Sequence, residues 1–338
     1  MKKNIVLLSC FFILISIVLS SKTVYGNDTE IGFSIRMIPS AYQHDINNTF
    51  FDLRLHPNQV ETVELEIKNT SNEKNTFEIN VNQAYTNNQG YIDYSDVNES
   101  KKNVYPIDIN KIVSYPHEIK LEANSLDKIP IQIKMPEKLF DGQVLAGIKV
   151  VKKEKETSNS AIQNRYGYIL GLKITETDTD EPRNIELKNV SPSITFGKPT
   201  IVAQLMNTSK DAIGHLKYHV IIEKNGTKNI VLKKTYNNNM ELAPNSMYNF
   251  AIESQNNLPL SAGKYKINLI ITDKKENKWT FNKIFSISDS TTKKVNSLTK
   301  NTRKPKVNLC LYAIITVFLL LFLFVLLKYL SIANKQKD

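Results

Sequence analysis

Residues 63–71 read V-E-L-E-I-K-N-T-S, and the pattern of this short segment recurs through much of the chain. Apolar Val63, Leu65 and Ile67 alternate with charged residues, and a polar turn begins at Asn69. A period of two is typical of a β-strand with one buried face. The segment therefore predicts a half-buried strand that runs directly into a tight polar turn.

The same strand and turn return in the second half of the chain, where residues 204–209 read Q-L-M-N-T-S, an offset of 138. Two further landmarks repeat at an offset of 121: the pairs Asn124-Ser125 and Asn245-Ser246, and the glycines Gly142 and Gly263. Such self-similarity indicates two copies of one structural unit. The first copy carries 17 extra residues between these landmarks, and we place them in the polar, tyrosine-rich segment 85–115.

Alternating strands also occupy most of the remaining sequence between the two ends. They include 77–81, 129–133, 216–222 and 265–271, and no convincing amphipathic helix lies among them. Strand after strand with polar turns predicts an all-β fold. We expect two tandem immunoglobulin-like antiparallel β-sandwiches, residues 27–176 and 183–288, separated by an acidic linker.

Both ends of the chain carry apolar segments. Residues 1–26 combine two lysines, an apolar run and a step of small residues, which predicts a cleavable signal peptide; an uncleaved anchor is the alternative. Residues 307–327 could cross a bilayer core of about 30 Å, which predicts a single C-terminal transmembrane helix. We expect a flexible stalk at 289–306 and a basic cytoplasmic tail at 328–338.

This topology predicts a single-pass protein of the cell membrane whose N-terminal ectodomain faces the cell wall. The two cysteines, Cys10 and Cys310, lie in the apolar segments, so the exported part cannot form a disulfide. Such a composition suits a Gram-positive surface protein. The formal charge of +11 favours anionic wall polymers and lipid headgroups, although lysines spread over a solvated surface explain it equally well. The location excludes nucleic acid as a partner.

The sequence shows no set of residues typical of an active site. His215 and His219 have the spacing of zinc ligands on a helix, but they lie in an alternating strand, which favours a solvated face. A Gly-x-Ser-x-Gly elbow, a phosphate loop, a dinucleotide fingerprint and an exported cysteine are all missing. We therefore expect no enzyme, no metal and no cofactor. A glycosidase whose two acids are distant in the chain stays open.

Binding is the remaining class of function, and the tyrosine-rich segment is the best candidate for it. Its aromatic residues are Tyr85, Tyr91, Tyr94, Tyr105 and Tyr115, and amide and carboxylate side chains accompany them. Flat aromatic faces beside such groups suit sugar rings or a protein partner. The alternative is that these tyrosines cover the edge of a sandwich.

Motifs in both halves carry a family resemblance. The first half has I-R-M-I-P at 35–39, F-F-D-L at 50–53, A-Y-T-N-N-Q-G at 84–90 and I-D-Y at 92–94; the second has M-E-L-A-P-N-S at 240–246 and W-T-F at 279–281. The first half resembles the peptidoglycan-binding domain of WxL-interacting proteins, formerly a domain of unknown function numbered 916. The second resembles their host-binding domain, formerly numbered 3324. Asn58 and Ala146 depart from the family pattern by replacing glycines.

The resemblance implies a non-enzymatic, membrane-anchored cell-surface adaptor. Its first domain would bind peptidoglycan, and its β-sandwich surfaces would bind WxL-domain surface proteins or host extracellular matrix proteins. A loop position for the contacts is our own hypothesis, and Gly90 has the alternative role of turning a hairpin. The candidate binding residues are Tyr85, Asn87, Gly90, Tyr91, Asp93 and Tyr94.

Two other functions stay open at this point. One is a cell-wall-processing hydrolase that uses dispersed acidic residues of the first domain. The other is a membrane-tethered chaperone or sensor, whose short tail would need a cytoplasmic partner.

Overall fold

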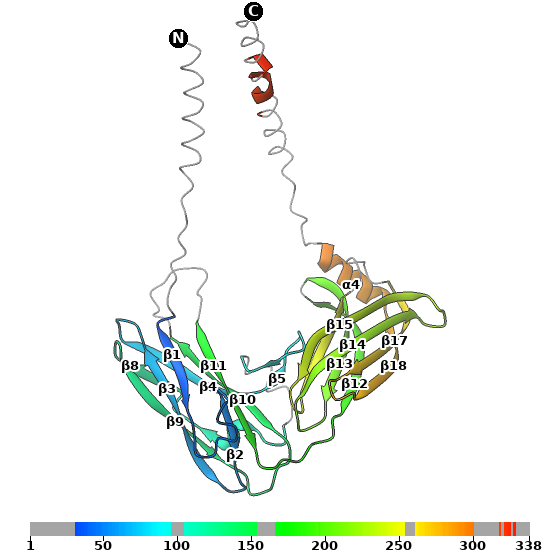
Figure 1. Cartoon of the computed structure of the whole chain (residues 1–338). Coiled ribbons are helices and arrows are strands. Elements are labelled where there is room, and N and C mark those ends of the chain that lie inside the picture. Colours follow the sequence, from blue (N-terminus) through cyan, green and yellow to red (C-terminus); the bar gives the residue numbers. More distant parts are fainter. Residues whose placement is uncertain are drawn as a thin grey trace, which may run out of the picture.

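The computed structural model describes residues 31–95, 105–153, 166–195, 197–253 and 261–300, together with 318, 321–325, 327 and 328. The predicted signal peptide and most of the predicted membrane helix lie outside the described residues. Among the helical residues that are described, none belongs to a helix long and apolar enough to cross a membrane. Strands dominate the described chain, and they form two β-sandwiches that follow one another in sequence (Figure 1).

The first sandwich packs a four-stranded sheet, in the order β1-β3-β9-β7, against a five-stranded sheet, in the order β2-β11-β10-β4-β8. The strands of the first sheet are β1 (Phe33–Ile38), β3 (Val60–Asn69), β9 (Leu126–Lys134) and β7 (Val113–Ser114). Those of the second are β2 (Phe51–Arg54), β11 (Gly167–Thr175), β10 (Val144–Lys152), β4 (Asn75–Gln83) and β8 (Glu118–Leu121). One pair, β2 with β11, is parallel, which corrects the expectation of a wholly antiparallel sandwich. β2 is the outer strand of this sheet and runs in the same direction as its neighbour β11.

The second sandwich is antiparallel in all the pairs described. Its sheets have the orders β12-β13-β16 and β15-β14-β17-β18. The strands are β12 (Ile185–Thr195), β13 (Lys198–Asn207), β16 (Met247–Glu253), β15 (Ile230–Leu242), β14 (Ile213–Lys224), β17 (Gly263–Thr272) and β18 (Lys278–Ile287). A separate two-stranded hairpin, β5 (Tyr85–Thr86) with β6 (Ile92–Asp93), lies between the two sandwiches (Figure 1).

Each sandwich has a core of its own, built by the inward positions of its alternating strands. In β3 the apolar residues Val63, Leu65 and Ile67 are buried, as their spacing predicts. The second core also contains a pair of buried tyrosines that bond to each other: the Tyr248 hydroxyl donates to the Tyr218 hydroxyl at 2.8 Å. Burial raises the pKa of both phenols. This hydrogen bond gives each of the two hydroxyl oxygens a partner inside an apolar core.

The repeat predicted from sequence corresponds to one network of hydrogen bonds made twice. In the first sandwich the Asn69 side chain is buried, and its Nδ2 donates to the carbonyls of Glu73, Leu121 and Glu122. The buried Asn207 of the second sandwich donates in the same way to the carbonyls at 211, 242 and 243. Each asparagine therefore ties its own turn to a neighbouring turn that is more than thirty residues away.

The second landmark of the repeat is a turn in which one residue has a left-handed backbone conformation. Asn124 has φ of 56° and its counterpart Asn245 has φ of 49°. Asparagine tolerates this conformation better than most other residues with a side chain. Asn58, which stands where the family usually has glycine, has φ of 61°, so the same tolerance of asparagine explains this replacement.

The segment predicted as a flexible stalk is helical in its first part, which corrects that expectation. Helix α4 (Asp289–Lys300) follows β18 and lies beside β12 and β13. Ser288 caps it, because the Ser288 Oγ accepts the amide hydrogen of Thr291 at 3.1 Å and its carbonyl accepts that of Thr292. This cap was overlooked in a segment that is otherwise polar and poor in apolar residues.

Replacing Asn69 with Asp tests the weight of the repeated network. The change removes the donor that serves three carbonyls and places a carboxylate against them, so we expect a loss of about 3–5 kcal/mol in unfolding free energy. Chemical denaturation measures it. Asn80→Asp, at an exposed position of β4, is the matched control and should change stability by less than about 0.5 kcal/mol. Equal effects of the two changes would contradict a structural role of the buried amide.

Candidate functional site

The candidate binding residues lie in and around the hairpin β5–β6, which falls within segment 85–115, where the sequence repeat places the 17 extra residues of the first copy. Its turn is held by Asn87, whose Oδ1 accepts from the amides of Gln89 and Tyr91 at 3.0 and 3.1 Å. Gly90 has φ of 82°, a left-handed conformation that suits glycine. The alternative role proposed for Gly90, turning a hairpin, is confirmed.

Asp93 closes the base of the hairpin. One carboxylate oxygen accepts from the amides of Tyr94 and Ser95 at 2.7 and 2.8 Å, and the other accepts from Asn87 Nδ2 at 3.3 Å. Burial alone would raise the pKa of Asp93, but these hydrogen bonds, led by Ser95, outweigh it and the pKa is lowered. The carboxylate is therefore ionised and already engaged in structural contacts.

The tip and first strand of the hairpin dock onto the second sandwich. The buried Thr86 accepts the amide hydrogen of Ala243 on its Oγ1 at 2.9 Å and that of the Ser246 hydroxyl at 3.0 Å. The Thr86 amide in turn donates to Ser246 Oγ at 2.8 Å. At the turn, the Glu241 amide donates to the Gly90 carbonyl at 2.7 Å. Four polar contacts thus join the first domain to the second.

Apolar contacts complete this junction. Ala84, Leu145 and Ala243 form a small buried cluster, against which Tyr94 and Ile92 pack. Tyr94 lies directly on the backbone of β10, because a Cβ added at Gly147 would stand 2.5 Å from Tyr94 Cβ. Burial, with the nearby carboxylates of Glu241 and Asp93, raises the pKa of the Tyr94 phenol to about 12.

The structure therefore corrects the expectation of an exposed binding loop. Tyr85 and Gly90 are buried, and Asn87, Asp93 and Tyr94 hold the hairpin together or pack beneath it. Of the six candidate residues, Tyr91 has the most accessible side chain, at 41% exposure. The two remaining tyrosines of the segment are also structural: Tyr105 donates to the Ala84 carbonyl at 2.7 Å, and Tyr115 accepts the Val81 amide hydrogen at 3.0 Å.

A second junction joins the domains beside the linker. The Gln143 amide donates to the Lys210 carbonyl at 3.0 Å. Gly142 has φ of 97°, and a Cβ there would lie 2.5 Å from Lys210 Cβ. The two backbone segments therefore meet with no room for a side chain at residue 142. Lys210 also lies 5.9 Å from the centre of the Phe140 ring and 3.4 Å from the Glu181 carboxylate. The two sandwiches are consequently fixed at two places as well as through the chain.

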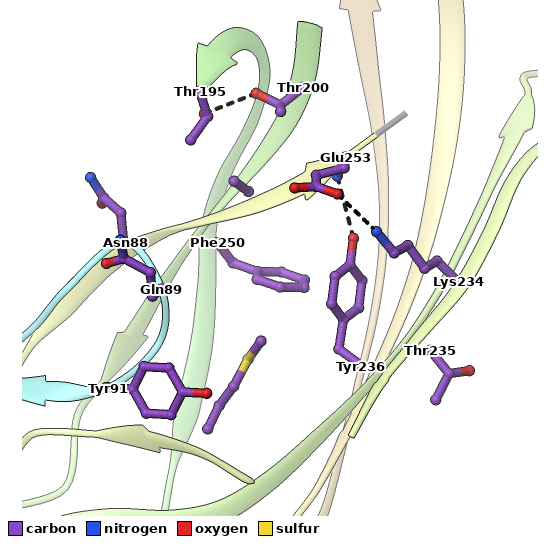
Figure 2. A pocket seen from close by; sticks show the side chains of 12 residues that line it. Asn88, Gln89, Tyr91, Thr195, Thr200, Lys234, Thr235, Tyr236, Phe250 and Glu253 are labelled. Atoms are coloured by element: carbon purple, nitrogen blue, oxygen red, sulfur yellow. Dashed lines mark hydrogen bonds and ion pairs between the residues drawn. The ribbon is translucent and has the colours of Figure 1, made fainter. Parts of the chain in front are cut away.

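A groove opens where the hairpin meets the second sandwich (Figure 2). The hollow has a volume of about 410 Å³. Tyr91 borders it on the hairpin side, Tyr236 borders it on the β15 side, and Phe250 lies between them in Figure 2. The ring centres of Tyr236 and Phe250 are 5.0 Å apart with the rings nearly perpendicular, so each ring restrains the other.

A neighbouring hollow of about 420 Å³ shares Asn88 and Thr195 with the first. Its other lining groups include Ser191, Ser193 and Asn249, which are small hydroxyl and amide side chains. The charged residues of the first hollow are Lys234 and Glu253, which pair with each other at 3.3 Å. The groove as a whole is thus aromatic and polar, with its charges balanced.

Sequence reasoning missed the residues that matter most here. Thr86 was passed over in favour of the tyrosines beside it, and Ser246 was noted only as a landmark of the repeat. Contacts across a domain junction leave no periodic signal in a sequence. The insertion itself was the available clue, because extra residues in one copy of a repeat often serve a contact that the other copy lacks.

The histidines and the acid considered from the sequence have structural surroundings in the described part of the chain. No group of three or more potential metal ligands occurs among the described residues. His215 and His219 are separated by irregular strand pairing, and His215 has φ of 57°. His219 Nδ1 lies 2.9 Å from Thr235 Oγ1. Asp93, an acid of the first domain, accepts hydrogen bonds within its own hairpin, so it adds no support to the hydrolase alternative.

Comparison with known proteins gives matches to two family models. Residues 33–152 match the model described as WxL Interacting Protein, peptidoglycan binding domain, and residues 157–297 match WxL Interacting Protein, host binding domain. Both agree with the resemblance seen in the sequence motifs. The second match includes β11, although β11 pairs within the first sandwich.

No curated protein matches the chain. Several solved structures of bacterial chaperones are similar at low identity. The class 5 fimbriae chaperone CfaA is 13% identical, with 75% of this chain and 99% of that chain covered and a TM-score of 0.29. The E. coli chaperone DraB is 14% identical, with 76% and 98% covered and a TM-score of 0.29. The Pseudomonas aeruginosa CupB2 chaperone is 12% identical, with 68% and 96% covered and a TM-score of 0.26.

Replacing Thr86 with Val tests whether the hairpin holds the two domains together. Valine keeps the shape but leaves the Ala243 amide and the Ser246 hydroxyl without their partner, a cost of about 1–3 kcal/mol. We expect a broader distance distribution between spin labels at exposed Lys68 and Lys266, measured by pulsed electron paramagnetic resonance. Thr62→Val, on the exposed face of β3, should leave it unchanged. An unaltered distribution in Thr86→Val would mean that other contacts suffice.

The pH dependence of stability should report the hydrogen-bonded carboxylate of Asp93. Because its folded-state pKa is lowered, it stabilises the fold above its unfolded pKa of about 3.9, and this contribution is lost as pH falls through the folded-state pKa. The difference in unfolding free energy between the natural chain and Asp93→Asn should be constant above about pH 5 and shrink at lower pH. A difference independent of pH down to about pH 2 would show that the carboxylate is not perturbed.

Proposed function

Because this chain belongs to the WxL Interacting Protein family, we propose that it is a non-enzymatic adaptor of the bacterial cell surface, which binds peptidoglycan and protein partners at the same time. The first domain contributes wall binding, in keeping with the description of its family model. The second meets WxL-domain proteins or host ligands, in keeping with the description host binding. The apolar run at residues 307–327, long enough to cross a bilayer core, would supply the membrane anchor.

The observation that carries this proposal is the docked hairpin. Thr86 and Gly90 of the first domain bond to Ser246, Ala243 and Glu241 of the second. An adaptor of this kind would hold its two partners in a fixed relative orientation. Two domains on a loose linker would not do so, because relative motion is the ordinary expectation for a small interface. The buried junction supplies the missing restraint.

Exposed edges of the second sandwich support the protein-binding half of the proposal. β15 and β18 are the outer strands of its four-stranded sheet. They carry exposed apolar side chains, namely Ile230 and Val231 on β15 and Ile284 on β18. An outer strand can pair through its main chain with a strand of another protein, and apolar side chains on it add contact area. These edges therefore suit a β-rich partner.

Co-sedimentation with peptidoglycan stripped of teichoic acids tests the wall-binding half. We expect the full-length chain to pellet with peptidoglycan at low salt and to remain bound at about 0.5 M salt, where the Debye length is only a few ångströms. Retention at high salt would show that neutral contacts dominate. A basic protein of similar charge without wall affinity is the control and should be released. Release of the chain with the control would show that the attraction comes only from its charge of +11 and would overturn the proposal.

A further inference from the structure

The groove between the hairpin and the second sandwich is built by both domains, although wall binding is assigned to the first domain alone. We propose that this groove is a subsite for an uncharged stretch of N-acetylated sugar chain, so that the two domains bind the glycan together. The inference rests on the proposed wall binding, and it goes further by naming the place and the chemistry. The docked hairpin would then both join the two domains and line the ligand site.

The aromatic side chains supply the first part of the case. Tyr91 is 41% exposed on the hairpin, and Tyr236 of β15 is half-buried across the groove from it (Figure 2). Phe250, which is only 2% exposed, closes the floor. Packing against Phe250 holds the Tyr236 ring, and its hydroxyl is engaged by the Glu253 amide at 3.3 Å. Rigid aromatic faces suit the apolar C–H faces of sugar rings.

The polar side chains supply the second part. The two hollows together are lined by Asn88, Gln89, Ser191, Ser193, Thr195 and Asn249. Hydroxyls both donate and accept hydrogen bonds, and amides present one acceptor and two donors. Sugar hydroxyls and N-acetyl groups need this mixture. Carbohydrate-like ligands therefore fit the groove better than purely apolar ones.

Charge and shape narrow the ligand further. Lys234 is paired with Glu253 at 3.3 Å and lies 4.7 Å from the centre of the Tyr236 ring, so this cation already has partners. Because the charge of Lys234 is compensated by Glu253, this pair offers little attraction to an anion such as a phosphate or a carboxylate. The two hollows adjoin at Asn88 and Thr195. Successive hollows suit a chain that runs along the surface rather than a single small molecule.

Binding of an uncharged N-acetylglucosamine oligomer to the full-length chain tests the proposal, with affinity measured by calorimetry. Tyr91→Ala and Asn249→Ala should each weaken binding by about tenfold, the loss of one stacking or hydrogen-bond contact. Thr86→Val should weaken it too, since it releases the hairpin without touching the groove. Tyr42→Ala, at a 43% exposed tyrosine of the first sandwich, is the control and should have no effect.

The same variants should be compared on whole peptidoglycan, so that the two proposals can fail separately. If the natural chain does not pellet with peptidoglycan, the proposed function itself is wrong. If it pellets but the oligomer does not bind, or if Tyr91→Ala and Asn249→Ala bind as well as the control, the groove is not the glycan subsite. An acidic peptide should be tested beside the oligomer. If Tyr91→Ala and Asn249→Ala weaken binding of the peptide but leave oligomer binding unchanged, the groove serves a protein partner and the inference is overturned.

Discussion

A buried asparagine amide holds the turns on which this molecule is assembled. Asn207 donates to the carbonyls of Leu242 and Ala243, and its own amide donates to the Ser246 carbonyl. The segment held in this way, 242–246, is the one that receives Thr86 of the hairpin. Unsatisfied carbonyls in that turn would cost free energy wherever the turn is buried, so one amide both closes the second sandwich and prepares the surface that the first domain uses.

Close approach of backbones is the second constraint, and glycines meet it. Gly147 lets Tyr94 lie on β10, and Gly142 lets the first domain reach Lys210. At Gly90 a Cβ would stand 3.1 Å from the Met240 side chain, and φ is positive there as well. The junction between the domains is therefore tight at each place where it is made. A tight junction of this kind fixes the width of the groove beside it.

Much of the fold was predictable because its physical cause is local. Alternation in β3 and β9 follows from one buried face, and the paired asparagines follow from a turn that each copy must close. The site was not predictable to the same extent. Tyr85 and Tyr94 looked like binding residues because a tyrosine in the sequence gives the same signal whether its ring faces a ligand or packs beneath a hairpin. Their burial depends on distant parts of the chain, such as β10 beneath Tyr94 and Ala243 of the second domain, and no pattern within 85–94 reports it. The parallel pairing of β2 with β11 depends likewise on distant parts of the chain.

The insertion gives the two copies of the repeat different roles. In the first copy the counterparts of Ala243 and Ser246 are Glu122 and Ser125, and Glu122 is an exposed residue that pairs with Lys74. A charged, solvated residue at that position cannot receive a hairpin as Ala243 does, because docking would remove its charge from water. The second copy has a small buried residue, Ala243, at the position where the hairpin docks. The difference at this position favours docking of the hairpin on the turn of the second copy, and the groove lies beside that contact.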